Sequence, residues 1–120
     1  MSFHVVTKST LYKVVPGSPV TVRVVIGDAQ AGGWIVAWDD QHIVAKGSDP
    51  QIVEIGVGAE LIGRSLQVNA TAVDVNPDTN RLSCTLAIGG GADGAKQIVS
   101  TYDDGDAGDS AVFATMIGFE

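Results

Sequence analysis

Features that mark several protein classes are scarce in this chain. It has one cysteine in 120 residues, so no intrachain disulfide can form, which is typical of a reducing compartment. Seven Lys and Arg residues stand against fourteen Asp and Glu residues, which gives a formal charge of −7. Nucleic acids and anionic membrane surfaces are bound by clustered cations, so we expect neither as a partner.

Long hydrophobic runs are also missing. No stretch approaches the ~20 apolar residues with which a helix crosses a membrane. The first ten residues, MSFHVVTKST, lack the basic start and apolar run of a secretory signal peptide. We therefore expect a soluble, cytoplasmic protein, and export by a route that needs no such signal stays open.

The residues that are present favour β structure. Apolar residues make up 45% of the chain, as in a globular protein, and Val, Ile and Ala are common among them. β-branched side chains suit a pleated surface, and the 15 glycines supply turns between short strands. A chain of this length is most simply one domain, residues 1–120.

Apolar and polar residues alternate in several segments. The pattern is clear in VTVRVVI (20–26), LQVNATA (66–72) and LSCTLAI (82–88). A period of two residues indicates strands with one buried face and one wet face, and such sheets are usually antiparallel. Strands are predicted at about 3–7, 10–15, 19–26, 34–38, 42–46, 51–56, 65–75, 81–88, 96–102 and 111–118.

The connections complete a fold prediction. Turn residues in NPDTN (76–80) predict a hairpin of 65–75 with 81–88, and GAELIG (58–63) predicts one helical turn that crosses between sheets. We expect an all-β, two-sheet antiparallel sandwich with an immunoglobulin- or fibronectin-like Greek key; a jelly roll and a small barrel are the alternatives. The tryptophans in GGWIVAW (32–38) resemble the buried Trp of such a strand, but the cysteine pair of antibody domains is absent, so the likeness is architectural.

No pattern of catalytic residues is recognisable. His42 follows Asp39 and Asp40, a spacing that is also common in exposed hairpins, and no third strong metal ligand is adjacent. Cys84 is in register with Leu82 and Leu86, so it is expected to point into the core and to be inert. We predict that the protein is not an enzyme; a catalytic role would need His42 with one of the two aspartates.

Two sets of residues are candidate ligand sites. Trp34 and Trp38 share one face of a strand, where they are either core anchors or an exposed platform for a sugar ring. Asp103, Asp104, Asp106 and Asp109 lie in a glycine-containing loop, 103–109, that is either a calcium site or a solvated turn. Calcium is thus the one possible cofactor, and aspartates in other turns, at 28, 39, 40, 78 and 93, are possible further ligands.

The function expected from these features is a non-enzymatic binding or assembly module. Strand edges and loops of a sandwich are available to a protein partner or to a second copy. The segments FHVV (3–6) and AVFATMIGFE (111–120) are apolar with a single charge, Glu120, so we expect them to be covered edges of a homo-oligomer. The alternative is a ligand-binding module for carbohydrate at the tryptophans or for calcium at the acidic loop.

Overall fold

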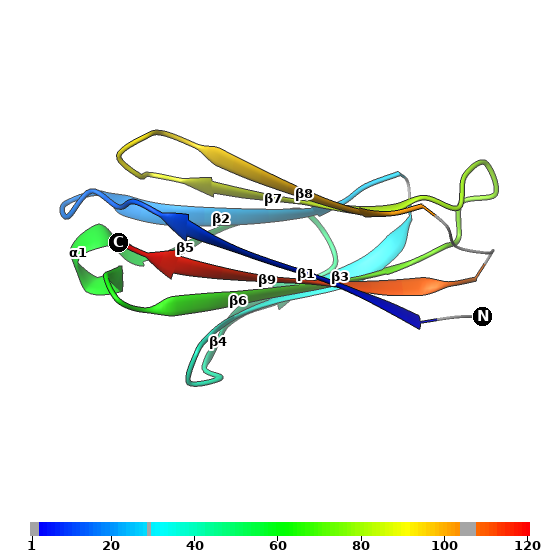
Figure 1. Cartoon of the computed structure of the whole chain (residues 1–120), viewed down its shortest axis with the longest axis horizontal. Coiled ribbons are helices and arrows are strands. Elements are labelled where there is room, and N and C mark those ends of the chain that lie inside the picture. Colours follow the sequence, from blue (N-terminus) through cyan, green and yellow to red (C-terminus); the bar gives the residue numbers. More distant parts are fainter. Residues whose placement is uncertain (1–2, 29, 104–107) are drawn as a thin grey trace.

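The computed structural model describes residues 3–28, 30–103 and 108–120, which form nine strands and one helical turn. The strands run along the long axis of a body of 46 × 26 × 21 Å, with the two termini at opposite ends (Figure 1). Their bounds are β1 Phe3–Tyr12, β2 Pro19–Ile26, β3 Ala31–Trp38, β4 Ile43–Gly47, β5 Ile52–Val57, β6 Ser65–Val73, β7 Leu82–Gly89, β8 Lys96–Tyr102 and β9 Ser110–Phe119.

Two sheets pack face to face, which confirms the all-β sandwich. One sheet has the order β1-β9-β6-β3-β4 and the other has the order β5-β2-β7-β8. Only β3–β4 and β7–β8 are hairpins within one sheet, while the other connections after β2 pass from one sheet to the other. The predicted helical turn, α1 (Gly58–Leu61), makes one of these crossings, between β5 and β6. No helix in the described residues is long and apolar enough to cross a membrane.

The position of the chain ends differs in part from the prediction. β1 is an edge strand, as expected for FHVV, and residues 3–7 and 10–12 belong to one continuous strand. The prediction for the last strand was wrong, because β9 lies between β1 and β6 and has no free edge. The β1–β9 pairing is also parallel. Alternation shows which side chains are buried, but it records neither the neighbour of a strand nor its direction.

The predicted hairpin of 65–75 with 81–88 was also wrong, because β6 and β7 belong to different sheets. Gln30, whose side chain is buried, fixes the crossover between them. Its amide nitrogen donates to the carbonyl groups of Thr79 and Arg81, each at 3.1 Å, and its amide oxygen accepts from the N–H groups of residues 75 and 76 at 2.7 Å. A side chain 45 residues away in sequence therefore satisfies backbone groups that a hairpin would have paired.

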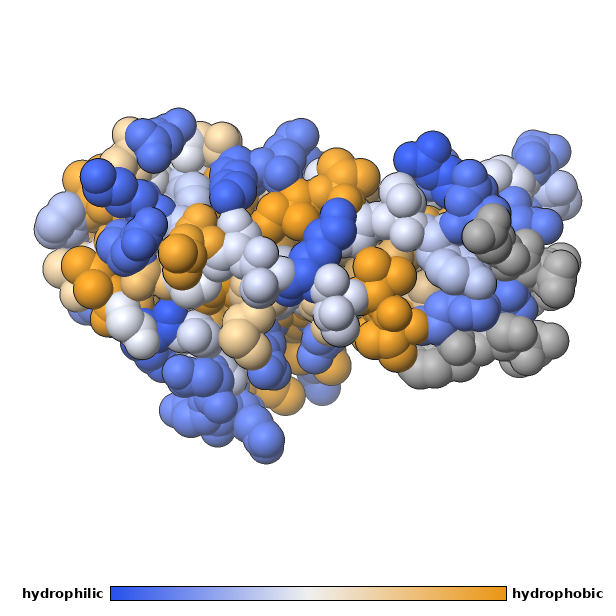
Figure 2. Space-filling model, viewed as in Figure 1, coloured by the Kyte–Doolittle hydropathy of each residue, from blue (hydrophilic) through white to orange (hydrophobic). Residues whose placement is uncertain are grey.

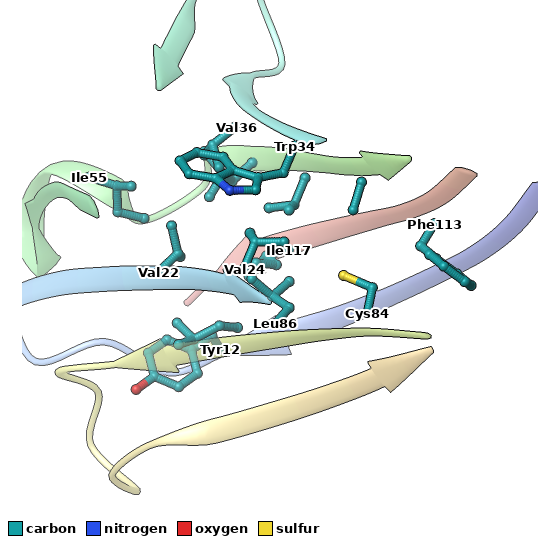
Figure 3. Packing of buried hydrophobic residues seen from close by; sticks show 14 of the residues in the cluster. Tyr12, Val22, Val24, Trp34, Val36, Ile55, Cys84, Leu86, Phe113 and Ile117 are labelled. Carbon is teal, nitrogen blue, oxygen red and sulfur yellow. The ribbon is translucent and has the colours of Figure 1, made fainter. Parts of the chain in front are cut away.

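The core fills the space between the sheets (Figure 3). Phe113 and Ile117 come from β9, and Leu86 faces them from β7; each is at most 2% exposed. Cys84 is buried in the same cluster, as predicted. Burial raises the pKa of its thiol from 9.0 to about 11, because the apolar surroundings disfavour the thiolate. The thiol is therefore protonated and unreactive at neutral pH.

Candidate functional site

Both tryptophans lie in the core, the first of the two roles that the sequence left open. The exposed fraction is 3% for Trp34 and 6% for Trp38. The indole N–H of Trp34 donates to the Asp49 carbonyl at 3.0 Å, and the guanidinium of Arg64 lies 3.9 Å from the ring centre of Trp38. A sugar ring has no access to these indoles in this arrangement, because the protein covers them.

The predicted calcium-loop residues fall into three groups. Asp103 is exposed, directly after β8. Asp104 and Asp106 lie outside the described residues. Asp109 is only 3% exposed, and its carboxylate oxygen Oδ2 lies 3.4 Å from Nε2 of His4, which is an ion pair when the imidazole is protonated.

The aspartates of the other turns divide between the two ends of the sandwich. Asp28 and Asp78 lie at the end that holds Asp103 and Asp109, while those at 39, 40 and 93 lie in or beside the hairpin turns of β3–β4 and β7–β8. Asp28 accepts a hydrogen bond from Ser83 at 2.7 Å and lies 3.4 Å from Nε of Arg81. Across residues 3–28, 30–103 and 108–120, no three His, Cys, Asp or Glu side chains come together as metal ligands.

His42 lies in the exposed turn between β3 and β4. Its backbone N–H donates to the Asp40 carboxylate at 3.0 Å, and its carbonyl accepts from the Trp38 N–H at 2.9 Å. Gln41 closes the turn with a φ of 68°. The Asp40 carboxylate therefore organises the backbone of a hairpin, which is a common role for Asp in turns.

Side chains join the edge strands β1 and β8 along one side of the sandwich, which we call the β1–β8 side. The imidazole of His4 stacks on Tyr102, with ring centres 3.9 Å apart. The Lys8 ammonium donates to the Val99 carbonyl, and Lys96 donates to the Thr10 hydroxyl at 2.6 Å. Seen from this side, hydrophobic patches are interrupted by hydrophilic residues (Figure 2).

Each of these two lysines bridges the space between β1 and β8, one from each strand. Lys8 extends from β1 to a backbone carbonyl of β8, and Lys96 extends from β8 to the Leu11 carbonyl of β1 at 3.5 Å. Unpaired backbone groups on an edge strand are a template for another strand, and lysine is a common means of blocking them. We infer that the β1–β8 side is protected against strand addition.

Removing this protection is expected to promote aggregation. In Lys8→Met and Lys96→Met, the edge carbonyl groups lose their donors, and an exposed cation is replaced by an apolar side chain. Each variant should scatter light earlier than the wild type during incubation below its melting temperature. Lys13→Met, which loses the same charge from an exposed position outside the strands, is the matched control. Equal scattering by Lys8→Met and Lys13→Met would show that the loss of any exposed lysine is responsible, and not the loss of an edge contact.

The outer surface of the five-stranded sheet is the largest uniform feature of the molecule. We call the outward positions of β1, β9, β6 and β3 the neutral face, because none of their described side chains is charged. Strand alternation and register assign these residues: Val5, Thr7, Ser9, Leu11, Ser110, Val112, Ala114, Met116, Gly118, Ser65, Gln67, Asn69, Thr71, Val73, Ala31, Gly33, Ile35 and Ala37. The first charged outward residue appears on the fifth strand, Lys46 of β4.

The lack of charge on this face is unusual for a solvent-exposed surface. A soluble surface carries roughly 25–35% Lys, Arg, Asp and Glu, so eighteen outward positions would carry about five. The outer surface of the four-stranded sheet does carry charges, from Arg23 of β2 and Glu54 of β5. The neutral face also exposes bulky apolar side chains, since Val5 and Leu11 are 59% and 62% exposed.

The neutral face has both hollows and protruding side chains. A hollow of about 400 Å³ lies over β1, β9 and β6; Ala114 and Met116 are among its lining residues, and Lys8 of the edge strand β1 also lines it. A second hollow, of about 560 Å³, lies over β3 and β4 beside Ile35. Each hollow includes a small residue of a middle strand, Ala114 in the first and Gly33 in the second. The exposed side chain of Leu11 lines a neighbouring hollow together with Met116.

Sequence reasoning missed this face, although part of its signal was visible. The polar half of the alternating segment 66–72, which is Gln67, Asn69 and Thr71, contains no charged residue. Their significance depends on the order of the strands, because only the β1-β9-β6-β3 arrangement joins four such halves into one surface. Comparisons of the chain with protein-family models, with curated proteins and with solved structures give no match.

Proposed function

We propose that the protein is a non-enzymatic assembly module that self-associates through the neutral face. The observation that carries this proposal is the absence of charged side chains from its eighteen outward positions. Each copy has a net charge of −7, so two copies repel each other at most orientations. Contact through the neutral face brings no like charges together.

The size of the face suits a dimer. Four strands ~4.8 Å apart, each with about nine residues at ~3.3 Å, cover roughly 570 Å² per copy, or about 1,100 Å² for a pair. That area exceeds the ~1,000 Å² expected of a specific interface and lies near the lower limit of the standard size. A reversible dimer is therefore the expected product.

The hollows and protruding side chains of the neutral face support a second copy of the chain as the partner. A two-fold interface joins the same surface of both subunits, so protruding and hollow parts must occur together on it. Met116 is exposed and lines the hollow over Ala114, and the exposed Leu11 lines the neighbouring hollow. The contact thus differs from the one expected from sequence, which used strand edges, because the lysines of the β1–β8 side block two of those edges.

Ala114→Glu tests this proposal. Ala114 lies between Thr7 of β1 and Asn69 of β6, near the middle of the neutral face. A glutamate there is solvated in the monomer, but in a dimer it places two carboxylates of like charge at the interface. Because like charges at an interface cost several kcal/mol, we expect the dimer to be at least ~100-fold weaker in sedimentation experiments.

Ala87→Glu is the matched control for this experiment. Ala87 is an equally half-buried alanine in a central strand, β7, and its outward neighbours are Arg23 and Gln97. It adds the same charge to the outer surface of the other sheet, so dimerisation should be nearly unchanged. If both variants weaken association equally, net charge and not the neutral face controls it. Melting curves of both monomers verify that they fold.

A further inference from the structure

Two carboxylates are buried next to each other at the end of the sandwich that holds the N-terminus. Asp74 follows β6 and Asp109 precedes β9. The Asp74 N–H donates to the Asp109 carbonyl at 2.8 Å, which extends the β6–β9 ladder by one pair beyond Val73 and Ser110. Ala72 and Ala111, two positions further into the strands, face the core, so alternation points both carboxylates inward.

This pair is costly unless something compensates its charge. Asp74 is 6% exposed and Asp109 is 3% exposed. Like charges that face each other across two strands repel, and burial increases the cost of each charge. A buried carboxylate is therefore expected to have a hydrogen-bond donor or a cation within contact distance.

Among the described residues, a side chain that can carry a positive charge contacts Asp109 but not Asp74. Asp109 has the His4 imidazole 3.4 Å from its Oδ2. The Oδ2 atom of Asp74 is buried and has no hydrogen-bond partner among residues 3–28, 30–103 and 108–120. The guanidinium of Arg81, the one described at this end, lies beside the carboxylate of Asp28. A buried, unpartnered carboxylate oxygen next to a second buried carboxylate points to a positively charged ligand.

We propose that Asp74 and Asp109 hold a hard divalent cation, of which calcium is the preferred one. Carboxylate oxygens are the ligands that calcium takes, and it accepts six to eight oxygens at ~2.3–2.6 Å in flexible geometry. Water and backbone carbonyl oxygens complete such a shell, so a site with two carboxylates needs no third acidic ligand. Asp28 and Asp103 lie at the same end and make it attractive to cations.

The site is separate from the proposed function. It lies on the inward side of β6 and β9, whereas the neutral face is the outward side of the same strands. A cation here joins two strands of one copy, so its effect is on stability and not on self-association. Failure of one proposal therefore leaves the other standing.

Thermal melts of the full chain test the cation site. Calcium binds the folded state alone, so at ~100-fold excess over the dissociation constant we expect the wild-type melting temperature to rise by roughly 5 °C or more above its value in EDTA. Asp74→Asn should lose this rise. Without calcium it should melt no lower than the wild type, because it removes one of two repelling charges. Asp78→Asn, an exposed position at the same end, is the control and should keep the full rise.

Other outcomes would overturn the proposal. The site does not exist if the wild type melts at the same temperature in calcium and in EDTA, or if only lowering the pH stabilises it, which indicates a shared proton. A calcium response retained by Asp74→Asn means that the cation binds elsewhere. An equal shift with sodium at the same ionic strength would mean general screening and would also overturn the proposal. An equal shift with magnesium would contradict the preference for calcium.

A second measurement keeps the test decisive if Asp74→Asn does not fold. Terbium replaces calcium in oxygen sites and emits when a nearby aromatic ring transfers excitation energy to it. Tyr102 stacks on His4, which contacts Asp109, so this ring lies close to the site. Terbium bound to the wild type should emit, calcium should displace it, and Tyr102→Phe should reduce the emission. Emission that Tyr102→Phe leaves unchanged would contradict this location.

Discussion

Phe113→Ala is expected to lower the free energy of unfolding by about 3–5 kcal/mol, the cost of removing a buried aromatic ring and leaving a cavity. Phe113 is 1% exposed and lies in β9, the strand between the edge strand β1 and the rest of its sheet. In register it is flanked by Val6 and Ala70, and small side chains such as Ala70 cannot fill the space. A domain of this size is stable by about 6–18 kcal/mol, so the loss is a large fraction of the total.

Guanidinium unfolding curves measure this effect. The control is Val112→Ala, one position earlier in the same strand, where the side chain points outward and the expected cost is below about 1 kcal/mol. If the two variants cost the same, β9 does not present alternate side chains to the core and to solvent. The neutral face would then lose its basis, because its residues are assigned by this alternation.

Gly90→Ala is expected to cost about 2–5 kcal/mol, although it adds a single methyl group. Gly90 follows β7 at a φ of +93°, a conformation that costs an L-residue about 1–2 kcal/mol. A Cβ atom there would also lie 2.0 Å from the Pro19 carbonyl oxygen, so the backbone of β2 or β7 must move. Such overpacking adds typically 1–3 kcal/mol.

Gly94→Ala separates these two contributions. Gly94 is in the same β7–β8 connection at a φ of +82°, but a Cβ atom there meets nothing within 4 Å. We therefore expect this variant to cost only the conformational part, about 1–2 kcal/mol, in the same unfolding experiment. Equal costs for the two variants would mean that the contact with Pro19 is relieved without strain.

Local patterns were sufficient to predict the strands and the sandwich. Alternation in segments such as 20–26 and 82–88 reflects the burial of one side of each strand, and the structure buries Val20, Val22, Leu82 and Leu86 accordingly. The buried position of Cys84 follows from the same periodicity. Periodicity also placed Trp34 and Trp38 on one face of a strand, but it did not decide whether that face is buried. These properties depend on one strand and its nearest turns, which the sequence displays directly.

Properties that depend on distant partners were not predictable in this way. NPDTN satisfies the requirements of a tight turn, but the Gln30 side chain hydrogen-bonds to the backbone on both sides of it. The segment connects β6 and β7, which belong to different sheets. Asp74 was missed for a similar reason. It follows an ordinary strand in the sequence, and only the β6–β9 pairing brings it to Asp109.

Sedimentation velocity of the wild-type chain, from low to high micromolar concentration, tests self-association through the neutral face most directly. We expect a concentration-dependent dimer with twice the monomer mass of 12.4 kDa. Its affinity should stay constant or rise between low salt and about 0.5 M NaCl, because salt screens the repulsion between two copies and there is no ion pair at the interface to weaken. A single species of 12.4 kDa at every concentration, or a dimer that dissociates as salt is added, would contradict this assembly.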